Sequence, residues 1–154
     1  MPQEIERKFL VKGDTWRSLG SGKQYKQGYI ASEQGRTVRV RVVGEQAWLT
    51  IKGKTQGIAR AEYEYPLPLD DALEMLQNLC PPPLVEKTRY RIPYEGNVWE
   101  VDEFAGDNAG LVIAEVELTG PDQAIALPEW VGQEVSDDPR YFNVNLAKHP
   151  YSQW

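Results

Sequence analysis

This chain of 154 residues contains 17 lysines and arginines and 23 aspartates and glutamates, which give it a net charge of −6 at pH 7. Its length predicts a single domain over residues 1–154, and its acidic balance argues against nucleic-acid binding, which needs a basic surface. The lone Cys80 and the lone His149 exclude an intramolecular disulfide and a zinc site rich in cysteine or histidine. No apolar run approaches 18 residues and acidic residues begin at position 4, so we expect a cytoplasmic protein without a membrane partner.

Polar and apolar residues alternate with period two through most of the chain, which predicts a mainly β (α+β) fold. Strands are expected at residues 3–11, 24–31, 36–43, 46–53, 60–67, 85–94, 97–104 and 111–119. Apolar residues at helical spacing predict a longer helix at 70–79, with Asp70 as its candidate cap and the following prolines as its stop. Shorter helices are expected at 14–19, 122–126 and 139–146.

The first strand carries a charged face. Side chains two apart share a face of a strand, so Glu4, Glu6 and Lys8 project together while Ile5 and Phe9 lie on the opposite face. For one isolated strand, a solvated edge is the simpler explanation of such a face. The same alternation in later strands favours a functional site instead.

Later strands carry charges of largely one sign at every second residue, whereas ordinary surface strands mix signs. The pairs are Arg39 with Arg41, Lys87 with Arg89, Glu62 with Glu64, Glu100 with Asp102, and Glu115 with Glu117. A closed sheet can turn such a face inward around one cavity, so we expect an eight-stranded antiparallel closed β-barrel with covering helices. Like charges repel at low dielectric, so an anion and a metal ion are the expected neutralisers. With carboxylate ligands alone, the expected metal is Mg²⁺ or Mn²⁺.

The order of these motifs along the chain resembles one protein family. Residues Glu4-Ile5-Glu6-Arg7-Lys8 are similar to the ExExK signature of the triphosphate tunnel metalloenzymes, also called CYTH domain proteins. The motifs that follow in family order are Gln27–Tyr29, Val38–Arg41, Thr50–Lys52, Glu62–Glu64, Val85–Tyr90, Glu100–Gly106 and Ala114–Glu117. The resemblance, to the compact stand-alone bacterial form, covers nearly the whole chain. It implies an eight-stranded antiparallel β-barrel with a charged tunnel that binds a linear triphosphate.

The resemblance also implies roles for the charged positions. Substrate contacts are expected from Arg39, Arg41, Lys52, Lys54, Arg60, Lys87 and Arg89. Metal ligands and their supporting acids are expected among Glu4, Glu6, Glu62, Glu64, Glu100, Asp102, Glu115 and Glu117. A salt bridge inside the tunnel is the alternative for each of these carboxylates. Lys54 would compensate for Thr37, where some relatives carry a basic residue, if its strand extends that far.

The resemblance also implies that Lys8 pairs with Tyr29, and the pair would act on the attacked or leaving phosphate, with Lys8 as a point charge or a proton donor. Packing as a strand aromatic is the alternative for Tyr29. The stretch from Asp137 to Asn143 resembles the entrance to the family's C-terminal helix. That helix would close one end of the tunnel or cover the barrel, with Arg140 in reach of the ligand.

Several activities occur in the family. The Lys8 and Tyr29 pair, with no evident base-recognition motif, favours metal-dependent hydrolysis of inorganic tripolyphosphate to pyrophosphate and phosphate. The alternatives are a thiamine triphosphatase, an adenylate cyclase that makes cyclic AMP from ATP, and a non-catalytic polyphosphate-binding module. An outer face rich in tryptophan and tyrosine is compatible with a homodimer.

Overall fold

The computed structural model describes residues 3–154. Its strands are β1 (Gln3–Val11), β2 (Gly22–Glu33), β3 (Arg36–Val43), β4 (Gln46–Lys52), β5 (Ala59–Leu67), β6 (Val85–Tyr94), β7 (Asn97–Phe104), β8 (Val112–Glu117) and β9 (Val131–Glu134). Its α-helices are α1 (Leu69–Asn78) and α2 (Asn143–Lys148), and its 3-10 helices are η1 (Thr15–Ser18), η2 (Gly106–Asn108), η3 (Pro139–Tyr141) and η4 (Tyr151–Gln153). In this described part of the chain, no helix combines the length and apolarity needed to cross a membrane.

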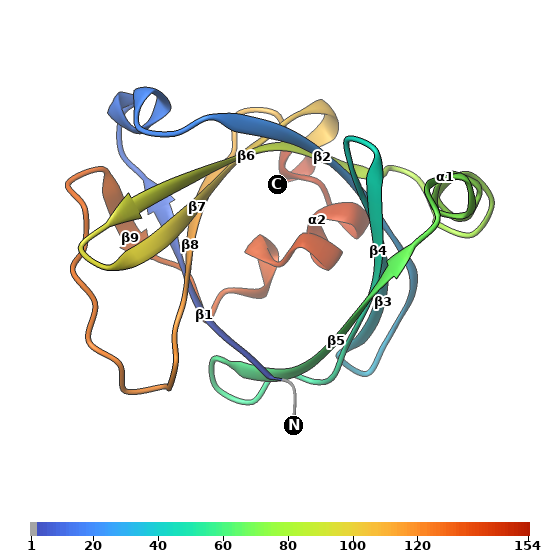
Figure 1. The fold of residues 1–154 in the computed structure, drawn as a ribbon, viewed down its shortest axis with the longest axis horizontal. Coiled ribbons are helices and arrows are strands. Elements are labelled where there is room, and N and C mark those ends of the chain that lie inside the picture. Colours follow the sequence, from blue (N-terminus) through green and yellow to red (C-terminus); the bar gives the residue numbers. More distant parts are fainter. Residues whose placement is uncertain (1–2) are drawn as a thin grey trace.

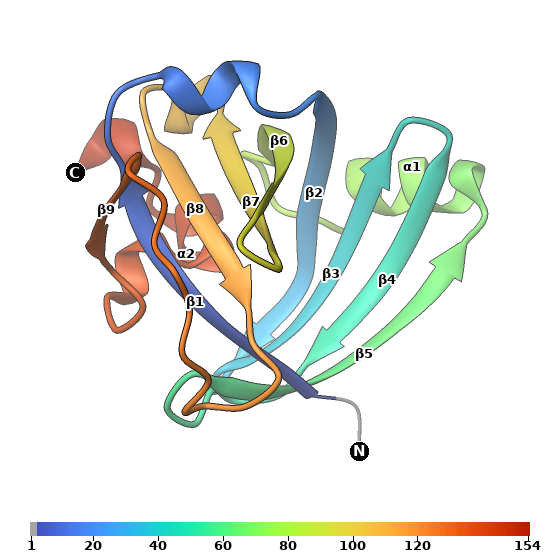
Figure 2. The same cartoon turned by 60° about the vertical axis from the view of Figure 1, so that its left-hand side comes forward.

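Eight antiparallel strands form a closed ring, because β1 pairs with a strand on each of its edges. Residues Glu6–Leu10 of β1 pair with β8, and residues Gln3–Ile5 pair with β5. The other neighbours follow in the order β5-β4-β3-β2-β6-β7-β8, and β9 extends the sheet beside the end of β1. Figure 1 looks down this ring, and Figure 2 shows β1 running beside β8 and meeting β5 near the N-terminus. The predicted closed sheet of eight antiparallel strands is confirmed.

Ring closure sends alternate side chains of each strand inward and outward, and the outward set forms an apolar core with the covering segments. Phe9 and Trp99 lie outside the ring and pack with Trp16 of η1 and with Trp130, the residue before β9. The ring centroids of Phe9 and Trp99 are 5.5 Å apart, and those of Trp99 and Trp130 are 5.9 Å apart. This packing holds β1, β7 and β9 in place.

Helix α1 covers another part of the outer face (Figure 1). Ala72 and Leu76 lie one turn apart on the helix and pack on Val40 and Ala47 of β3 and β4. The prediction that Asp70 caps this helix is wrong, because Pro68 occupies the N-cap position. Asp70 instead lies in the first turn, where a negative charge favours the helix dipole.

The C-terminal segment closes one end of the ring. Tyr141 and Leu146 pack against Val85, Phe104 and Ile113, which come from β6, β7 and β8. Figure 1 shows α2 lying within the outline of the ring. The segment therefore fills the interior at this end, as expected for a C-terminal helix that closes one end of the tunnel and not for one that covers the outside of the barrel.

Two predicted helices differ from the structure, and one strand of the structure was not predicted. Residues 122–126 form no helix, because a five-residue amphipathic run ahead of Pro128 is too short to offset the cost of helix nucleation. The helix expected at 139–146 is divided into η3 and α2. Nothing in the sequence predicts β9, since its four residues contain one buried side chain, Val131, and no alternation.

Trp99 provides a test of the outer core. Its side chain is wholly buried, so Trp99→Ala removes a large apolar group and leaves a cavity. We expect this change to lower the free energy of unfolding by about 3–5 kcal/mol. Val98→Ala is the matched control, because Val98 is the exposed neighbour on the same strand. Denaturant unfolding followed by circular dichroism measures both, and equal effects would contradict the assignment of this core.

Candidate active site

The interior of the ring contains a cavity of about 270 Å³. The predicted site residues that line it are Glu4, Glu6, Lys8, Tyr29, Arg39, Arg41, Lys52, Arg60, Glu62, Glu64, Lys87, Arg89, Glu100, Glu115 and Glu117. Residues 142–144 of the C-terminal segment line it as well. The charged faces of separate strands therefore converge on one enclosed space.

The basic side of the cavity is built by two strands that flank β2. Arg39 and Arg41 come from β3, and Lys87 and Arg89 come from β6 on the other edge of β2. The Arg39, Lys87 and Arg89 side chains are buried, and Nε of Arg39 has no hydrogen-bond partner among the described residues. Guanidinium and ammonium groups with N–H donors to spare are suited to binding a phosphate chain.

Asp102 lies behind the basic side and does not line the cavity. Its fully buried carboxylate accepts hydrogen bonds from Nε and Nη2 of Arg89 at 2.7 and 2.9 Å and lies 2.8 Å from Nζ of Lys87. Burial alone would raise the pKa of Asp102, but the charges of Arg89 and Lys87 outweigh it and hold this pKa below its usual range. This geometry favours the salt-bridge alternative for Asp102 over a role as metal ligand.

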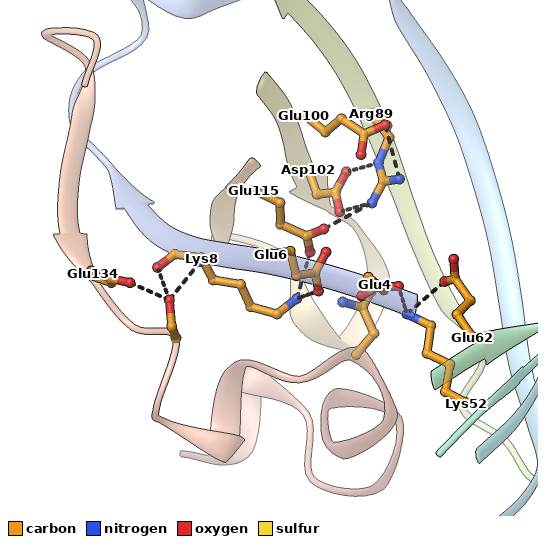
Figure 3. Close-up of polar contacts among 12 residues, drawn as sticks. Glu4, Glu6, Lys8, Lys52, Glu62, Arg89, Glu100, Asp102, Glu115 and Glu134 are labelled. Atoms are coloured by element: carbon orange, nitrogen blue, oxygen red, sulfur yellow. Dashed lines mark hydrogen bonds and ion pairs between the residues drawn. The ribbon is translucent and has the colours of Figure 1, made fainter. Parts of the chain in front are cut away.

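The acidic side of the cavity comes mainly from β1 and β8, where Glu6 is paired in register with Glu117 and Lys8 with Glu115. Nζ of Lys8 lies 2.7 Å from a carboxylate oxygen of Glu115 and 3.4 Å from one of Glu6. Figure 3 shows this lysine reaching between the two carboxylates. Lys8 thus holds together acidic side chains from two strands.

Lys52 of β4 makes a second link of this kind. Its Nζ lies 2.7 Å from a carboxylate oxygen of Glu4 on β1 and 3.5 Å from one of Glu62 on β5 (Figure 3). The link spans the seam where β1 and β5 close the ring.

Negative charge is in excess on this side. Burial and the neighbouring Glu115 raise the pKa of Glu6 to about 7, against the opposing effect of Lys8. Burial, followed by the charges of Glu4 and Glu6, also raises the pKa of Glu117. Both shifts indicate a place where a bound cation would be stabilised.

The acidic side chains fit a hard divalent cation. Glu4, Glu6 and Glu117 offer carboxylate oxygens, the ligands that Mg²⁺ and Mn²⁺ prefer. Oε1 of Glu4 is buried and has no hydrogen-bond partner within residues 3–154. Within residues 3–154 no three acidic, histidine or cysteine side chains converge as a ready-made ligand set, and Lys8 and Lys52 hold several of the carboxylates. A bound cation would therefore compete with these lysine contacts.

Positive charge is in excess on the opposite side. Burial, together with Arg39 and Arg89, lowers the pKa of Arg41 to about 9. Burial lowers the pKa of Lys87 to about 7, an effect partly offset by Asp102 and reinforced by Arg89. A polyanion bound along this side would relieve the repulsion among these groups.

Three residues predicted to contact the ligand have different surroundings from the rest of the set. Strand β4 ends at Lys52, and Lys54 is exposed in the following loop and does not line the cavity. Arg60 lines the cavity, but its guanidinium donates to the carbonyl oxygens of Gly53 and Gly35 at 3.0 and 3.1 Å. Arg140 is exposed, lies outside the lining and pairs with Asp138 at 2.8 Å.

Lys8 and Tyr29 both line the cavity, but no hydrogen bond joins them in the described part of the chain. The Tyr29 hydroxyl instead accepts a hydrogen bond from Nε2 of Gln27 at 3.3 Å. Lys8 is held by carboxylates, as described above. The catalytic roles of the two residues stay predictions.

Two uncharged residues that the charge pattern did not select also belong to the site. Gln27 is fully buried behind the lining, and its Oε1 accepts a hydrogen bond from Nε of Arg41 at 2.9 Å. Oδ1 of Asn143 accepts a hydrogen bond from Nζ of Lys87 at 2.9 Å. Gln27 shares the inward face of β2 with Tyr29, so alternation predicts its direction, whereas no periodic signal marks Asn143.

The fold and the site together define a class of protein, a closed antiparallel sheet that encloses a cavity between basic and acidic strands. The CYTH domain family model matches residues 2–151 of the chain. The chain belongs to the CYTH domain family.

Relatives with a similar sequence or structure agree with this membership. An inorganic triphosphatase of Acetivibrio thermocellus is 50% identical over 154 residues, which cover 100% of this chain and 99% of the relative. An inorganic triphosphatase of Nitrosomonas europaea is 37% identical over 153 residues, which cover 94% of this chain and 96% of the relative. A crystal structure of an inorganic triphosphatase matches with a TM-score of 0.64 and 35% identity, covering 93% of this chain and 96% of that chain.

Asp102 provides a test of the basic side. Asp102→Asn keeps the shape of the side chain but leaves Arg89 and Lys87 buried without their shared negative partner. We expect the free energy of unfolding at pH 7 to fall by about 3–5 kcal/mol, the cost of breaking a buried ion pair on one side. Asp138→Asn, which breaks the exposed pair with Arg140, should have little effect. A similar result for both variants in denaturant unfolding would show that Asp102 is not a structural anchor.

Proposed function

We propose that this protein hydrolyses inorganic tripolyphosphate to pyrophosphate and phosphate with a divalent metal ion, Mg²⁺ or Mn²⁺. The observation that carries the proposal is the cavity itself, where buried cations on β3 and β6 face an acidic side on β1 and β8. Relatives that are 50% and 37% identical along nearly their whole length are inorganic triphosphatases.

The basic side binds the phosphate chain. Arg39 and Arg41 present planar sets of N–H donors that match phosphate oxygens, and Lys87 and Arg89 add charge from the other side of β2. Asp102 holds Arg89 in a fixed orientation through two hydrogen bonds. The substrate is therefore positioned by groups that are already in place before it binds, which lowers the entropic cost of the reaction.

On the acidic side, Glu4, Glu6 and Glu117 would hold the metal, with Glu115, Glu62, Glu64 and Glu100 as supporting acids. When bound, a divalent ion polarises the phosphoryl group under attack and orients water. In the reaction, a water oxygen forms a bond to the terminal phosphorus as the P–O bond to the bridging oxygen breaks, that oxygen leaves with the pyrophosphate, and the proton lost by the water passes to solvent. Lys8 lies at the junction of Glu6 and Glu115, where its ammonium group would stabilise charge that develops on the phosphate.

Tyr29 lines the cavity on the strand between the two basic strands. Its hydroxyl would contact a phosphate oxygen directly. The proposed substrate is a small triphosphate, so the reaction needs neither nucleic acid nor a membrane. It is compatible with a homodimer and with a cytoplasmic location.

Glu4 provides the test of function. Its buried Oε1 has no hydrogen-bond partner in the described part of the chain, and Glu4→Gln removes the charge while keeping the size of the side chain. We expect wild-type protein with Mg²⁺ or Mn²⁺ to release phosphate from tripolyphosphate, and Glu4→Gln to lower kcat/KM by about 100-fold or more. Glu129→Gln is the control, since Glu129 is exposed and lies outside the cavity lining.

Parallel assays with thiamine triphosphate and ATP separate this activity from its alternatives. Faster turnover of thiamine triphosphate would indicate a thiamine triphosphatase, and formation of cyclic AMP would indicate a cyclase. Tripolyphosphate binding without turnover under any metal would indicate a binding module. Chelation by EDTA should abolish phosphate release, and undiminished release would contradict the metal requirement.

A further inference from the structure

Strand β2 lies between two strands with basic inner faces, and its own charges are at Lys23, Lys26 and Glu33. Its side chains that turn toward the basic residues are Tyr25, Gln27 and Tyr29. The ring of Tyr25 lies 4.9 Å from Cζ of Arg41 and 5.0 Å from Cζ of Arg89, within range of a cation–π interaction. β2 therefore separates and contacts the cations of β3 and β6 without neutralising them.

The four cations differ in what orients them. Arg89 and Lys87 share Asp102, and Arg39 lies 3.6 Å from a carboxylate oxygen of Glu64. Arg41 has no carboxylate within ion-pair distance among residues 3–154, and its Nε donates to the Gln27 side-chain amide instead. The orientation of Arg41 thus depends on an uncharged partner.

Gln27 is itself held by the C-terminal segment. Its Nε2 lies 3.3 Å from Oδ1 of Asn143 and 3.3 Å from the Tyr29 hydroxyl. Oδ1 of Asn143 also accepts the hydrogen bond from Lys87. The two amides therefore form a bridge from Arg41 through Gln27 and Asn143 to Lys87.

The direction of this bridge follows from the chemistry at its ends. Ammonium and guanidinium groups are donors only, so Lys87 must face the amide oxygen of Asn143 and Arg41 must face the amide oxygen of Gln27. The amide nitrogen of Gln27 is then left to donate to Asn143. Each amide has one orientation that satisfies both of its neighbours.

We infer that Gln27 is a positioning residue, which acts with Asn143 to orient Arg41 and Lys87 toward a linear triphosphate. The inference rests on the proposed function and adds to it a requirement for amides at these two positions. A carboxylate at either position would form an ion pair with its cation and compete with the phosphate chain. An amide orients the cation and leaves its charge available to the ligand.

The bridge also links the anion site to the C-terminal segment. Asn143 is the first residue of α2, and the neighbouring Phe142 and Val144 line the cavity. The hydrogen bond to Lys87 forms only when this segment is seated inside the ring. The segment therefore completes the basic side as well as closing the end of the cavity.

The experiment compares Gln27→Glu and Gln27→Met with Gln24→Glu. Gln24 lies on the same strand but is exposed, so Gln24→Glu adds the same charge away from the site. The measurements are the Kd of tripolyphosphate by calorimetry without metal, and KM and kcat with Mg²⁺. We expect both Gln27 variants to raise Kd and KM by about 10-fold to 100-fold, the value of a hydrogen bond to a charged group, with a smaller change in kcat. Gln24→Glu should match wild type.

Asn143→Leu is the second variant, because Asn143 is only partly buried and the protein should tolerate the change. It should also raise Kd and KM. In a double-mutant cycle, Gln27→Met combined with Asn143→Leu should lose less affinity than the product of the two single effects, because both break one bridge. If Gln27→Met does not fold, Asn143→Leu and Gln27→Glu still decide the question.

A purely structural role for Gln27 would lower thermal stability without changing Kd or KM of the folded protein, and that result would overturn the inference. Independent effects in the double-mutant cycle would overturn it too, since they would show two separate contacts. The proposed function fails separately, if wild-type protein neither binds nor hydrolyses tripolyphosphate. If wild type hydrolyses tripolyphosphate and the folded Gln27 variants have the same Kd and KM as wild type, the proposed function stands and only the amide bridge is rejected.

Discussion

Repulsion between buried charges of the same sign is the constraint on which the interior of this protein depends. The closed ring turns the charged faces of its strands other than β2 inward, because closure leaves each strand one inner and one outer face. Charges so close together in a poorly hydrated space are costly unless each is paired or oriented. The lysine links to Glu4 and Glu115 and the shared Asp102 meet this requirement on both sides of the cavity. The pairing of charges is incomplete. Burial and neighbouring charges of the same sign raise the pKa of Glu6 and lower the pKa of Arg41.

The side chains next to the buried cations stabilise them in different ways. Asp102 cancels charge and fixes geometry together, which suits Arg89 and Lys87 because one carboxylate serves two cations. Gln27 orients Arg41 through a hydrogen bond but cancels none of its charge. A site of carboxylate partners alone would be more stable when empty but would bind a polyanion more weakly, since the phosphate would have to displace each ion pair. The mixture keeps the cations ordered and leaves them net positive charge.

Much of the fold and of the charged site follows from residue alternation, since a period of two specifies both the strand and the side on which each residue lies. That rule places Glu4, Arg39 and Glu115 on one inner face without any knowledge of strand order. It fails where backbone direction changes. Lys54 has the right spacing from Lys52, but β4 ends before it and the loop carries it outward. Asn143 and β9 lie in a segment whose position is set by packing against the finished ring, and no local pattern encodes such long-range contacts.

The excess of negative charge and the excess of positive charge lie on opposite sides of one cavity. The binding of a cation on the acidic side is therefore coupled to the binding of an anion on the basic side. A cation on the acidic side raises the positive potential felt by an anion, and an anion along β3 and β6 does the same for the cation, so each must increase the affinity of the other. A single phosphate would relieve the repulsion at only part of the basic side. A linear chain of phosphates that reaches from Arg39 and Arg89 to the carboxylates of β1 would relieve it along the whole side while contributing oxygen ligands to the cation. The distribution of charge inside the ring therefore favours an extended, metal-bound polyanion over either ion alone.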